Sequence, residues 1–236
     1  MDYIISKDTS KFKNKYLSSG TTADCYLTPD KRVYKEFTKN VLEEVYDNIV
    51  RLSDLDIDSF VLPETLVFSD SPSHETIEGY LMRYSKGIDF KNISSYVKMR
   101  DFLKSLSKFE KDINELSKKK FEIYDLKSAN VLYTPDGKID VLDTDFYKYY
   151  PNVLEEDLRV CNFMELEYLL YTSFIRENQK KLKNPKLLSM YERFSDGKEL
   201  ATDYLSELIA EIEKETQESV DTYGDFKAGM KHILRA

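Results

Sequence analysis

Three oxygen-bearing side chains surround a predicted β-hairpin near the middle of the sequence. Asp125 comes just before the hairpin, Asn130 lies at its base and Asp143 comes just beyond it. The two strands are predicted over residues 129–133 and 138–142. The residues between the strands, Thr-Pro-Asp-Gly, are typical of a tight turn. Because a hairpin brings its two ends together, we expect Asn130 and Asp143 to lie beside each other. Asp125 should lie a short distance away, on the loop that leads in.

This set of side chains suits the transfer of a phosphoryl group. An amide oxygen beside a carboxylate is a good binding site for Mg²⁺, which takes few protein ligands and keeps positions for phosphate oxygens. A free carboxylate nearby can accept or orient the proton of a hydroxyl group. Histidine chemistry is disfavoured, because the chain has two histidines, His74 in a polar loop and His232 near the C-terminus. A Ser-His-Asp triad would have to recruit one of them, and a His-rich metal site is excluded.

The elements that must position these residues change in kind along the chain. The first part is mostly short strands, with one helix whose apolar residues recur every three or four positions. After Gly87 the apolar spacing becomes helical, apart from the hairpin. The predicted strands cover residues 16–17, 24–27, 32–37, 60–68 and 77–84, and the predicted helices cover 41–52, 102–116, 158–174, 187–194, 200–212 and 223–234.

These elements predict an α+β fold with two lobes. Residues 1–84 would form a small lobe with a five-stranded sheet and one helix, and residues 85–236 a larger helical lobe that holds the hairpin. The chain has 236 residues, of which 41% are hydrophobic and 33% charged, so it can bury a core.

Composition also limits the partners and the compartment. A formal net charge of -8 disfavours nucleic acid as the main partner, because phosphate binding needs a basic surface. Two cysteines cannot build a disulfide framework, which favours a reducing compartment. No signal peptide is recognisable, and no apolar run is long enough to span a membrane. We therefore expect a soluble cytoplasmic protein with no membrane partner.

The same residues, in the same order, resemble the protein kinase-like family, and the resemblance covers most of the chain. The stretch from Asp125 to Asn130, Asp-Leu-Lys-Ser-Ala-Asn, is similar to the catalytic-loop pattern D-L-K-x-x-N, and Asp143 stands where the metal-binding Asp of D-F-G is expected. The resemblance implies ATP and Mg²⁺ as cofactors, Asp125 as the catalytic base and Lys127 as a contact to the transferred phosphate. Asn130 and Asp143 would hold the Mg²⁺.

The N-terminal part agrees with this resemblance. Val-Tyr-Lys ending at Lys35 is similar to the V-A-I-K strand, whose lysine pairs with the α- and β-phosphates of ATP. In the family a helical glutamate holds this lysine, and Glu44 or Glu43 is the candidate. The other nucleotide-binding residues that the resemblance implies are Ser18, Ser19, Gly20 and Thr21 in a degenerate glycine-rich loop, and Met82 and Tyr84 at the hinge.

The sequence departs from the family pattern in several places. Tyr124 replaces the usual Arg before the catalytic Asp, so switching by phosphorylation is not expected. Asp145 follows the metal-binding position in place of Gly, and we expect it to be a second metal ligand. Asp157, at the start of a predicted helix, would brace the catalytic loop. The stretch between Asp143 and Asp157 is too short for a full activation segment with an Ala-Pro-Glu-like triplet, which leaves the substrate open.

Three functions therefore compete. The leading hypothesis is a kinase for Ser/Thr hydroxyls of a protein, because protein kinases of this type carry Lys at the position of Lys127, whereas aminoglycoside- and choline-type kinases usually carry His. The second is a small-molecule kinase, which the missing activation segment and Asp145 favour. The third is a nucleotide-binding pseudokinase that acts as a scaffold. The degenerate glycine-rich loop favours a scaffold, but a scaffold has no chemical need for Lys35, Asp125 and Asn130.

Overall fold

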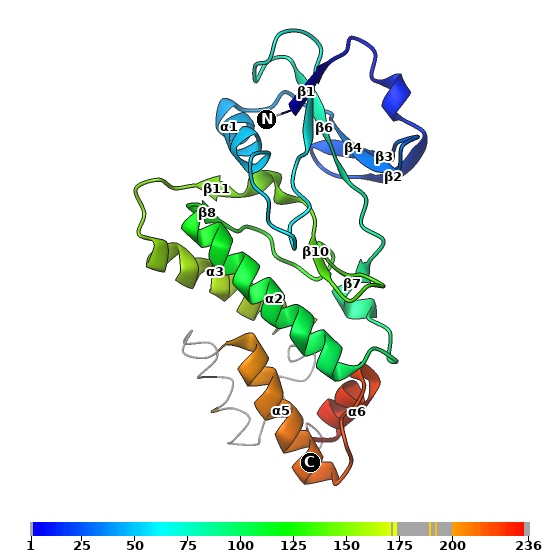
Figure 1. The fold of residues 1–236 in the computed structure, drawn as a ribbon, viewed down its shortest axis with the longest axis vertical. Coiled ribbons are helices and arrows are strands. Elements are labelled where there is room, and N and C mark those ends of the chain that lie inside the picture. Colours follow the sequence, from blue (N-terminus) through cyan, green and yellow to red (C-terminus); the bar gives the residue numbers. More distant parts are fainter. Residues whose placement is uncertain (1, 171, 174–188, 190–191, 193–199, 234–236) are drawn as a thin grey trace. The chain divides into compact units, whose positions relative to one another are not determined.

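The computed structural model describes residues 2–170, 172–173, 189, 192 and 200–233, and it confirms the α+β class (Figure 1). The chain forms two compact units. The first contains Met1–Lys86 together with Leu142–Tyr147, and the second contains Gly87–Val141 together with Lys148–Ala236. The sequence placed the boundary after residue 84 and kept residues 85–236 together. The structure instead groups the short segment Leu142–Tyr147, which carries Asp143 and Asp145, with the first unit.

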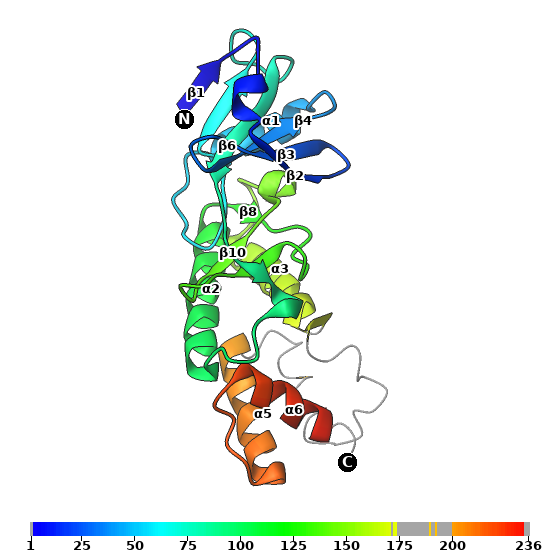
Figure 2. The ribbon, with the colours of Figure 1, turned by 90° about the vertical axis from the view of Figure 1, so that its right-hand side faces the viewer.

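The first unit contains a six-stranded sheet (Figure 2). The strand order is β1-β5-β6-β4-β3-β2. All neighbours are antiparallel except β1 and β5, which are parallel. The edge strand β1 was not expected, and the strand predicted over 60–68 is confined to its second half because Pro63 cannot donate to a ladder. The strands are β1 (Asp2–Ile5), β2 (Lys15–Ser19), β3 (Ala23–Leu27), β4 (Arg32–Phe37), β5 (Thr65–Phe68) and β6 (Ile77–Arg83).

Alternation along β4 decides which of its side chains face the site. Tyr34 is buried with Val67 and Leu81 on one face of the sheet. Val33 lies on the opposite face, in a larger cluster that includes Ile49 of helix α1 (Glu43–Leu52). Because successive strand residues point to opposite faces, Lys35 shares the face of Val33, which α1 covers. The 3₁₀ turn η3 (Thr144–Phe146) also packs against α1.

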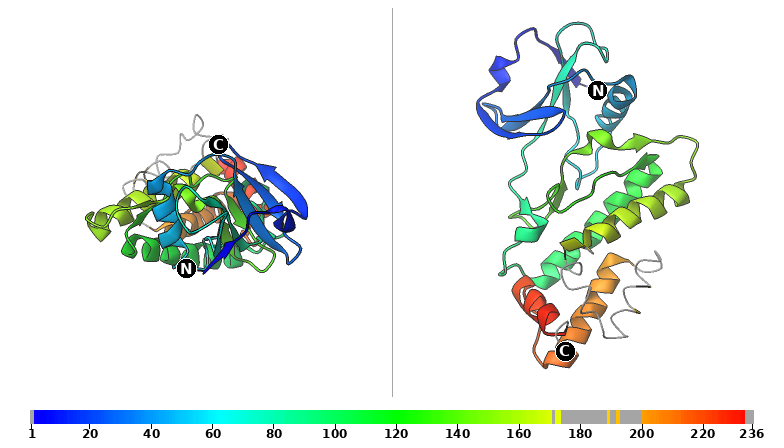
Figure 3. Two further views of the ribbon diagram at one scale, coloured as in Figure 1. Left: turned by 90° about the horizontal axis from the view of Figure 1, so that it is seen from above. Right: turned by 180° about the vertical axis from the view of Figure 1, so that it is seen from behind.

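The second unit is built around helix α2 (Met99–Lys118), which packs against α3 (Glu155–Leu170) and α5 (Ala201–Thr216); α5 also contacts α6 (Tyr223–Ile233) (Figure 3). The expected hairpin is present as β9 (Val131–Tyr133) and β10 (Ile139–Val141), and β7 (Ile88–Asp89) extends it to three strands. A second small sheet pairs β8 (Phe121–Glu122) with β11 (Lys148–Tyr149). In the described part of the chain, no helix has the length and apolar character of a membrane span. The helix predicted over 187–194 lies almost wholly outside the described residues.

A buried carboxylate joins two of these helices. Glu110, in the middle of α2, is 4% exposed, and its Oε1 accepts a hydrogen bond from the backbone N–H of Ala201 at 2.5 Å. Its Oε2 accepts from the Thr202 hydroxyl at 2.6 Å. These donors belong to the first residues of α5, whose N–H groups have no partner within the helix. Glu110 therefore caps α5 from a neighbouring helix.

Candidate functional site

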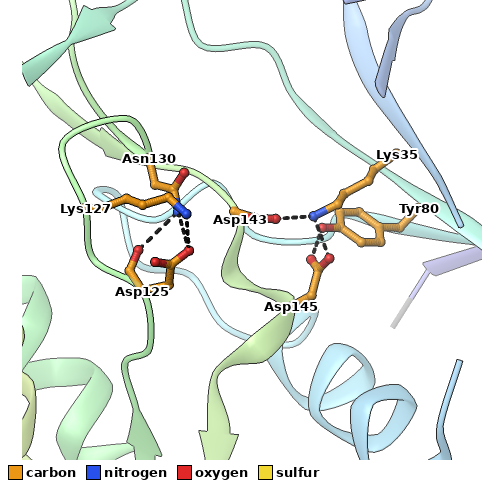
Figure 4. A network of polar contacts seen from close by, with 7 residues as sticks. All are labelled: Lys35, Tyr80, Asp125, Lys127, Asn130, Asp143 and Asp145. Carbon is orange, nitrogen blue, oxygen red and sulfur yellow. Dashed lines mark hydrogen bonds and ion pairs between the residues drawn. The ribbon is translucent and has the colours of Figure 1, made fainter. Parts of the chain in front are cut away.

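In the first unit, Lys35 on β4 forms an ion pair with Asp143, which comes just after β10 in the sequence. The Lys35 Nζ lies 2.5 Å from Oδ1 of Asp143 (Figure 4). Lys35 is 6% exposed, whereas 38% of the Asp143 side chain is exposed. Burial by itself lowers the pKa of Lys35, but the charges of Asp145 and Asp143 outweigh burial and raise it. Lys35 is therefore a fixed positive charge, and Asp143 keeps one carboxylate oxygen that this pair does not use.

Asp145 forms the other half of this cluster. Its Oδ2 lies 2.5 Å from the Lys35 Nζ, and its Oδ1 accepts a hydrogen bond from the Tyr80 hydroxyl. Asp145 is 2% exposed and Tyr80 1%. Burial, followed by the charge of Asp145, raises the pKa of Tyr80 well above its ordinary value, so the phenol remains a donor. Lys35 thus sits between two carboxylates from one short segment.

The expected partner of Lys35 on the following helix is not there. Glu43 and Glu44 are both exposed in the first turn of α1, and neither pairs with Lys35 in the described structure. The prediction for these glutamates was wrong because α1 begins at Glu43. Both therefore sit at the solvated, electropositive N-terminus of the helix, where acidic residues are favoured. The buried face of α1 begins one turn later, at Asn48 and Ile49.

The prediction that Asp145 is a metal ligand also needs correction. Both carboxylate oxygens already have partners, Lys35 and Tyr80, and the group is closed off from solvent. A cation would have to displace an ammonium from a buried pair, which leaves a charge uncompensated. Asp143 is the carboxylate of the segment that is open to a metal ion.

The second unit holds the other group of predicted site residues, on one loop: Asp125 and Lys127, predicted as catalytic, and Asn130, predicted as a metal ligand. The Lys127 Nζ lies 2.5 Å from Oδ2 of Asp125. The Asn130 amide nitrogen donates to the Asp125 carbonyl at 3.1 Å and to its Oδ2 at 3.3 Å. About half of each of the Asp125 and Lys127 side chains is exposed. The amide oxygen of Asn130 points away from Asp125 and is not used in these contacts (Figure 4). The loop therefore presents a carboxylate, an ammonium and an amide oxygen together.

Two of the predicted site residues have an unusual backbone conformation. Asp125 has φ 61° and Asp143 has φ 62°. Among described residues other than glycine, three more have positive φ: one in a strand-connecting turn and two at helix C-termini, where that conformation is common. These are Lys31, Lys120 and Gln217. Asp125 and Asp143 have neither explanation. Such strain is found at functional sites, and Asp tolerates it better than most residues.

Helix α3 braces the loop from behind. Oδ1 of Asn162 accepts from the Ile123 N–H at 2.7 Å, and its amide nitrogen donates to the Phe121 carbonyl at 2.9 Å. Glu165, one turn later, accepts from the Leu126 N–H at 3.2 Å. Asn162 is completely buried. Sequence reasoning missed it, although an Asn four residues from each of two buried leucines on one helix face could have identified it.

The residue expected to brace the loop does not do so. Asp157 is exposed in the first turn of α3, beside two other acidic residues. Acidic residues are favoured at that end of a helix by the N-terminal N–H groups. The buried face of α3 continues from Leu158 to Asn162. The correct helix was predicted, but the wrong polar residue on it was chosen.

The degenerate glycine-rich loop is an exposed hairpin between β2 and β3. Ser18 and Ser19 end β2, and the Gly20 N–H donates to the Ala23 carbonyl at 2.8 Å, which closes the turn over Thr21. All four predicted residues, Ser18, Ser19, Gly20 and Thr21, are exposed. A Cβ on Gly20 would lie 3.5 Å from that carbonyl oxygen, an ordinary contact. The turn therefore does not require glycine, and its exposed backbone remains open to a ligand.

The predicted hinge residues lie at the end of β6. Met82 is buried opposite Val33 of β4, within the main core cluster. Tyr84 follows the strand and is 42% exposed. The chain then leaves the first unit after Lys86. Met82 is thus a core side chain, while Tyr84 stands at the exit from the sheet, where a connection between lobes is expected.

The oxygen donors suit Mg²⁺ in kind. Asp143 offers one carboxylate oxygen and Asn130 an amide oxygen, the hard ligands that this ion prefers. No group of three or more His, Cys, Asp or Glu side chains in the described residues is arranged to hold a metal by itself. Asn130 and Asp143 belong to different units, so their expected proximity stays a prediction.

No protein-family model and no curated protein matches this chain. Function must therefore be inferred from the chemistry of the two groups of residues. The first is a buried ammonium between two carboxylates, one of which is open to solvent. The second is an exposed loop with a strained aspartate, a lysine and an asparagine.

Proposed function

We propose that this protein is an ATP- and Mg²⁺-dependent phosphotransferase with a bilobal protein kinase-like fold, which phosphorylates Ser or Thr hydroxyls of a protein. The observation that carries the proposal is the 2.5 Å pair between Lys35 and Asp143, 108 residues apart in the sequence. The resemblance gives Lys35 the phosphate-binding role and Asp143 the metal-binding role. If the similarity of the two short motifs were due to chance, there would be no reason for these residues to be in contact. The strained backbone of Asp125 and Asp143 adds support.

The residues have distinct parts in this reaction. Lys35 is a buried, permanently charged group that attracts phosphate oxygens. Asp143 and Asn130 would hold Mg²⁺, which when bound neutralises charge on the phosphates of ATP. Asp125 accepts the proton of the substrate hydroxyl, whose oxygen forms a bond to the γ-phosphorus as the bond to ADP breaks. Lys127, 2.5 Å from the Asp125 carboxylate, provides positive charge for the transferred group.

A small-molecule kinase is the second candidate, and one observation favours it. Helix α3 begins at Glu155, so only residues 144–154 separate it from Asp143. Conventional protein kinases dock peptides on a longer segment at this point. The other argument for this candidate, Asp145 as a second metal ligand, is lost because Asp145 is buried against Lys35 and Tyr80.

Calorimetric titration with ATP tests the proposal directly. We expect the wild type to bind ATP more tightly with Mg²⁺ than without it. In the variant Asp143→Asn, this gain from Mg²⁺ should disappear, since asparagine tolerates the left-handed backbone but lacks the charge. Asp136→Asn is a matched control, because Asp136 is an exposed aspartate in the hairpin turn. If the wild type does not bind ATP in either condition, the proposal is wrong.

A transfer assay with labelled ATP then separates the candidates. Transfer to proteins of a cell lysate, or to the protein itself, would support the main proposal. Transfer only to an aminoglycoside or choline-like compound would favour the second candidate. ATP binding without transfer to any acceptor would leave a nucleotide-binding scaffold.

A further inference from the structure

Lys35 receives its second carboxylate from an unexpected part of the chain. The resemblance assigns this role to a glutamate on the helix after β4. In the described structure, however, Glu43 and Glu44 are exposed and neither forms an ion pair with Lys35. Instead, Oδ2 of Asp145 lies 2.5 Å from the Lys35 Nζ. Asp145 is only two residues beyond Asp143, the other partner of the same ammonium. One short segment therefore supplies both carboxylates.

Tyr80 fixes the position of Asp145. Tyr80 is the cross-strand partner of Lys35 in the β4–β6 ladder, so the two side chains lie on one face of the sheet. Its hydroxyl donates to Oδ1 of Asp145, and the Lys35 Nζ lies 5.9 Å from its ring centroid. The Phe37 ring packs edge-on against Tyr80, at 5.9 Å between centroids. The phenol is thus held by the sheet and holds Asp145 in turn (Figure 4).

This arrangement makes the position of Lys35 independent of a side chain on α1. The helix packs against η3 and buries Ile49 and Leu52, but its acidic first turn faces solvent. The partners of Lys35 come from β6 and from residues 143–145, all within one compact unit. Neither ion pair of Lys35 therefore involves a side chain of α1.

We propose that Asp145, held by the Tyr80 hydroxyl, positions Lys35 for the phosphates of the nucleotide, in the role that the resemblance gives to a helical glutamate. The proposal rests on the proposed function, because it names how that nucleotide site is organised. Asp145 and Tyr80 are positioning residues that act through Lys35. A buried, hydrogen-bonded carboxylate holds a lysine in one rotamer, whereas an exposed glutamate would not.

The first test compares two buried tyrosines of the same sheet. Tyr80→Phe removes only the hydroxyl that holds Asp145, and Tyr34→Phe removes one from the opposite face. We expect Tyr80→Phe to raise the Kd for ATP and its KM about tenfold, the effect of one hydrogen bond to a charged group, while kcat changes less. Tyr34→Phe should bind ATP like the wild type. Thermal unfolding of each variant checks the fold.

A double-mutant cycle separates positioning from general loosening of the sheet. If Tyr80 acts through Lys35, then Tyr80→Phe should change ATP affinity by less than about twofold in a Lys35→Met background. Displacement of a fluorescent ATP analogue gives the range that this comparison needs. An undiminished tenfold effect in that background, or an equal loss in Tyr34→Phe, would overturn the proposal.

A last pair of variants compares the contributions of Asp145 and of the helical glutamates to ATP binding. We expect Asp145→Asn to weaken ATP binding about tenfold or more, and the double variant Glu43→Gln/Glu44→Gln to bind as the wild type does. The reverse result would restore the helical glutamate and overturn the role of Asp145. If the wild type does not bind ATP at all, the proposed function itself fails. Normal binding by the wild type and by both Tyr80→Phe and Asp145→Asn overturns only the positioning role.

Discussion

The Lys35 Nζ lies 2.5 Å from Oδ1 of Asp143, although the two residues are 108 positions apart in the sequence. The ion pair is one of the contacts that link the segment Leu142–Tyr147 to the first unit. Leu142–Tyr147 lies between β10 and β11 along the chain, and both of these strands belong to the second unit, yet the segment packs with the first. The acidic residues of the segment therefore stay with Lys35, while Asp125 stays with the second unit.

Because Asp125 has a left-handed backbone conformation, replacing it with asparagine and with alanine should have different effects on stability. We expect Asp125→Asn and Asp125→Ala both to slow phosphoryl transfer by about 10²–10⁴-fold while ATP binding is kept, the range for a positioned proton acceptor. Only Asp125→Ala should also lose stability, by about 1–2 kcal/mol, because alanine is strained at φ 61° and asparagine is not. Transfer assays, calorimetry and urea unfolding give the three quantities.

The two variants separate chemistry from structure. A large loss of transfer in Asp125→Ala alone would show that the backbone conformation of the loop, and not the carboxylate, is required. Full activity in both variants would exclude Asp125 as the base.

Asn162 should matter for the stability of the loop. Asn162→Ala leaves the Ile123 N–H and the Phe121 carbonyl buried without partners, which costs about 1–3 kcal/mol for each group. We therefore expect a loss of roughly 2–6 kcal/mol in the free energy of unfolding, measured in urea. The exposed Asn152 of the same unit provides the control, and Asn152→Ala should change stability by less than about 0.5 kcal/mol. Similar values for the two variants would contradict the bracing role.

Local sequence patterns predicted the hairpin and the helices, because the formation of these elements depends mainly on residues that are neighbours in the sequence. The Pro-Asp-Gly turn predicted the β9–β10 hairpin, and the apolar spacing of Phe102 and its followers predicted α2. Lys35 and Asp143 were named as candidate site residues because the short motifs around them resemble those of the protein kinase-like family. These predictions required no knowledge of which distant residues would meet.

Three errors at the candidate site concern the tertiary partners of polar residues. Glu44 was chosen for Lys35 because it lies on the next helix, but the rotation of α1 about its axis decides which side chains face the sheet. Asp157 was chosen because it begins the predicted helix, and Asn162, on the buried face of the same helix, was not considered. Asp145 was interpreted from the type of its carboxylate, whereas burial beside Lys35 determines what it binds. One sequence does not show how a helix is turned or which charge is buried.

Gly79 is required by the close approach of β6 to β4. A Cβ at this position would lie 2.1 Å from the Lys35 carbonyl oxygen, a backbone atom that can move only if the strand moves. We expect Gly79→Ala to destabilise the protein by roughly 3 kcal/mol, at the upper end for overpacking. Gly20→Ala is the control and should change stability by less than about 1 kcal/mol, since its Cβ meets only an ordinary contact. Equal effects in urea unfolding would mean that β6 can shift freely.

Glu110 gives the protein a pH dependence whose sign can be worked out. Burial raises its pKa above the ordinary value of 4.5, with the nearby charge of Asp203 adding to this, although the hydrogen bonds from Thr202 and Ala201 act in the opposite direction. The folded protein therefore holds this proton more tightly than the unfolded chain does. The contribution of Glu110 to the free energy of unfolding therefore falls as the pH rises from about 4.5 through the raised pKa.

The variant Glu110→Gln isolates this contribution, because glutamine does not titrate and the other carboxylates are unchanged. We expect the free energy of unfolding of the wild type, minus that of the variant, to decrease from pH 4 to pH 8 in urea titrations. A difference that increases with pH would mean that the N–H groups at the start of α5 stabilise the charged carboxylate more than burial destabilises it. Glu110 would then act as a charged cap of α5, and its pKa would lie below the ordinary value.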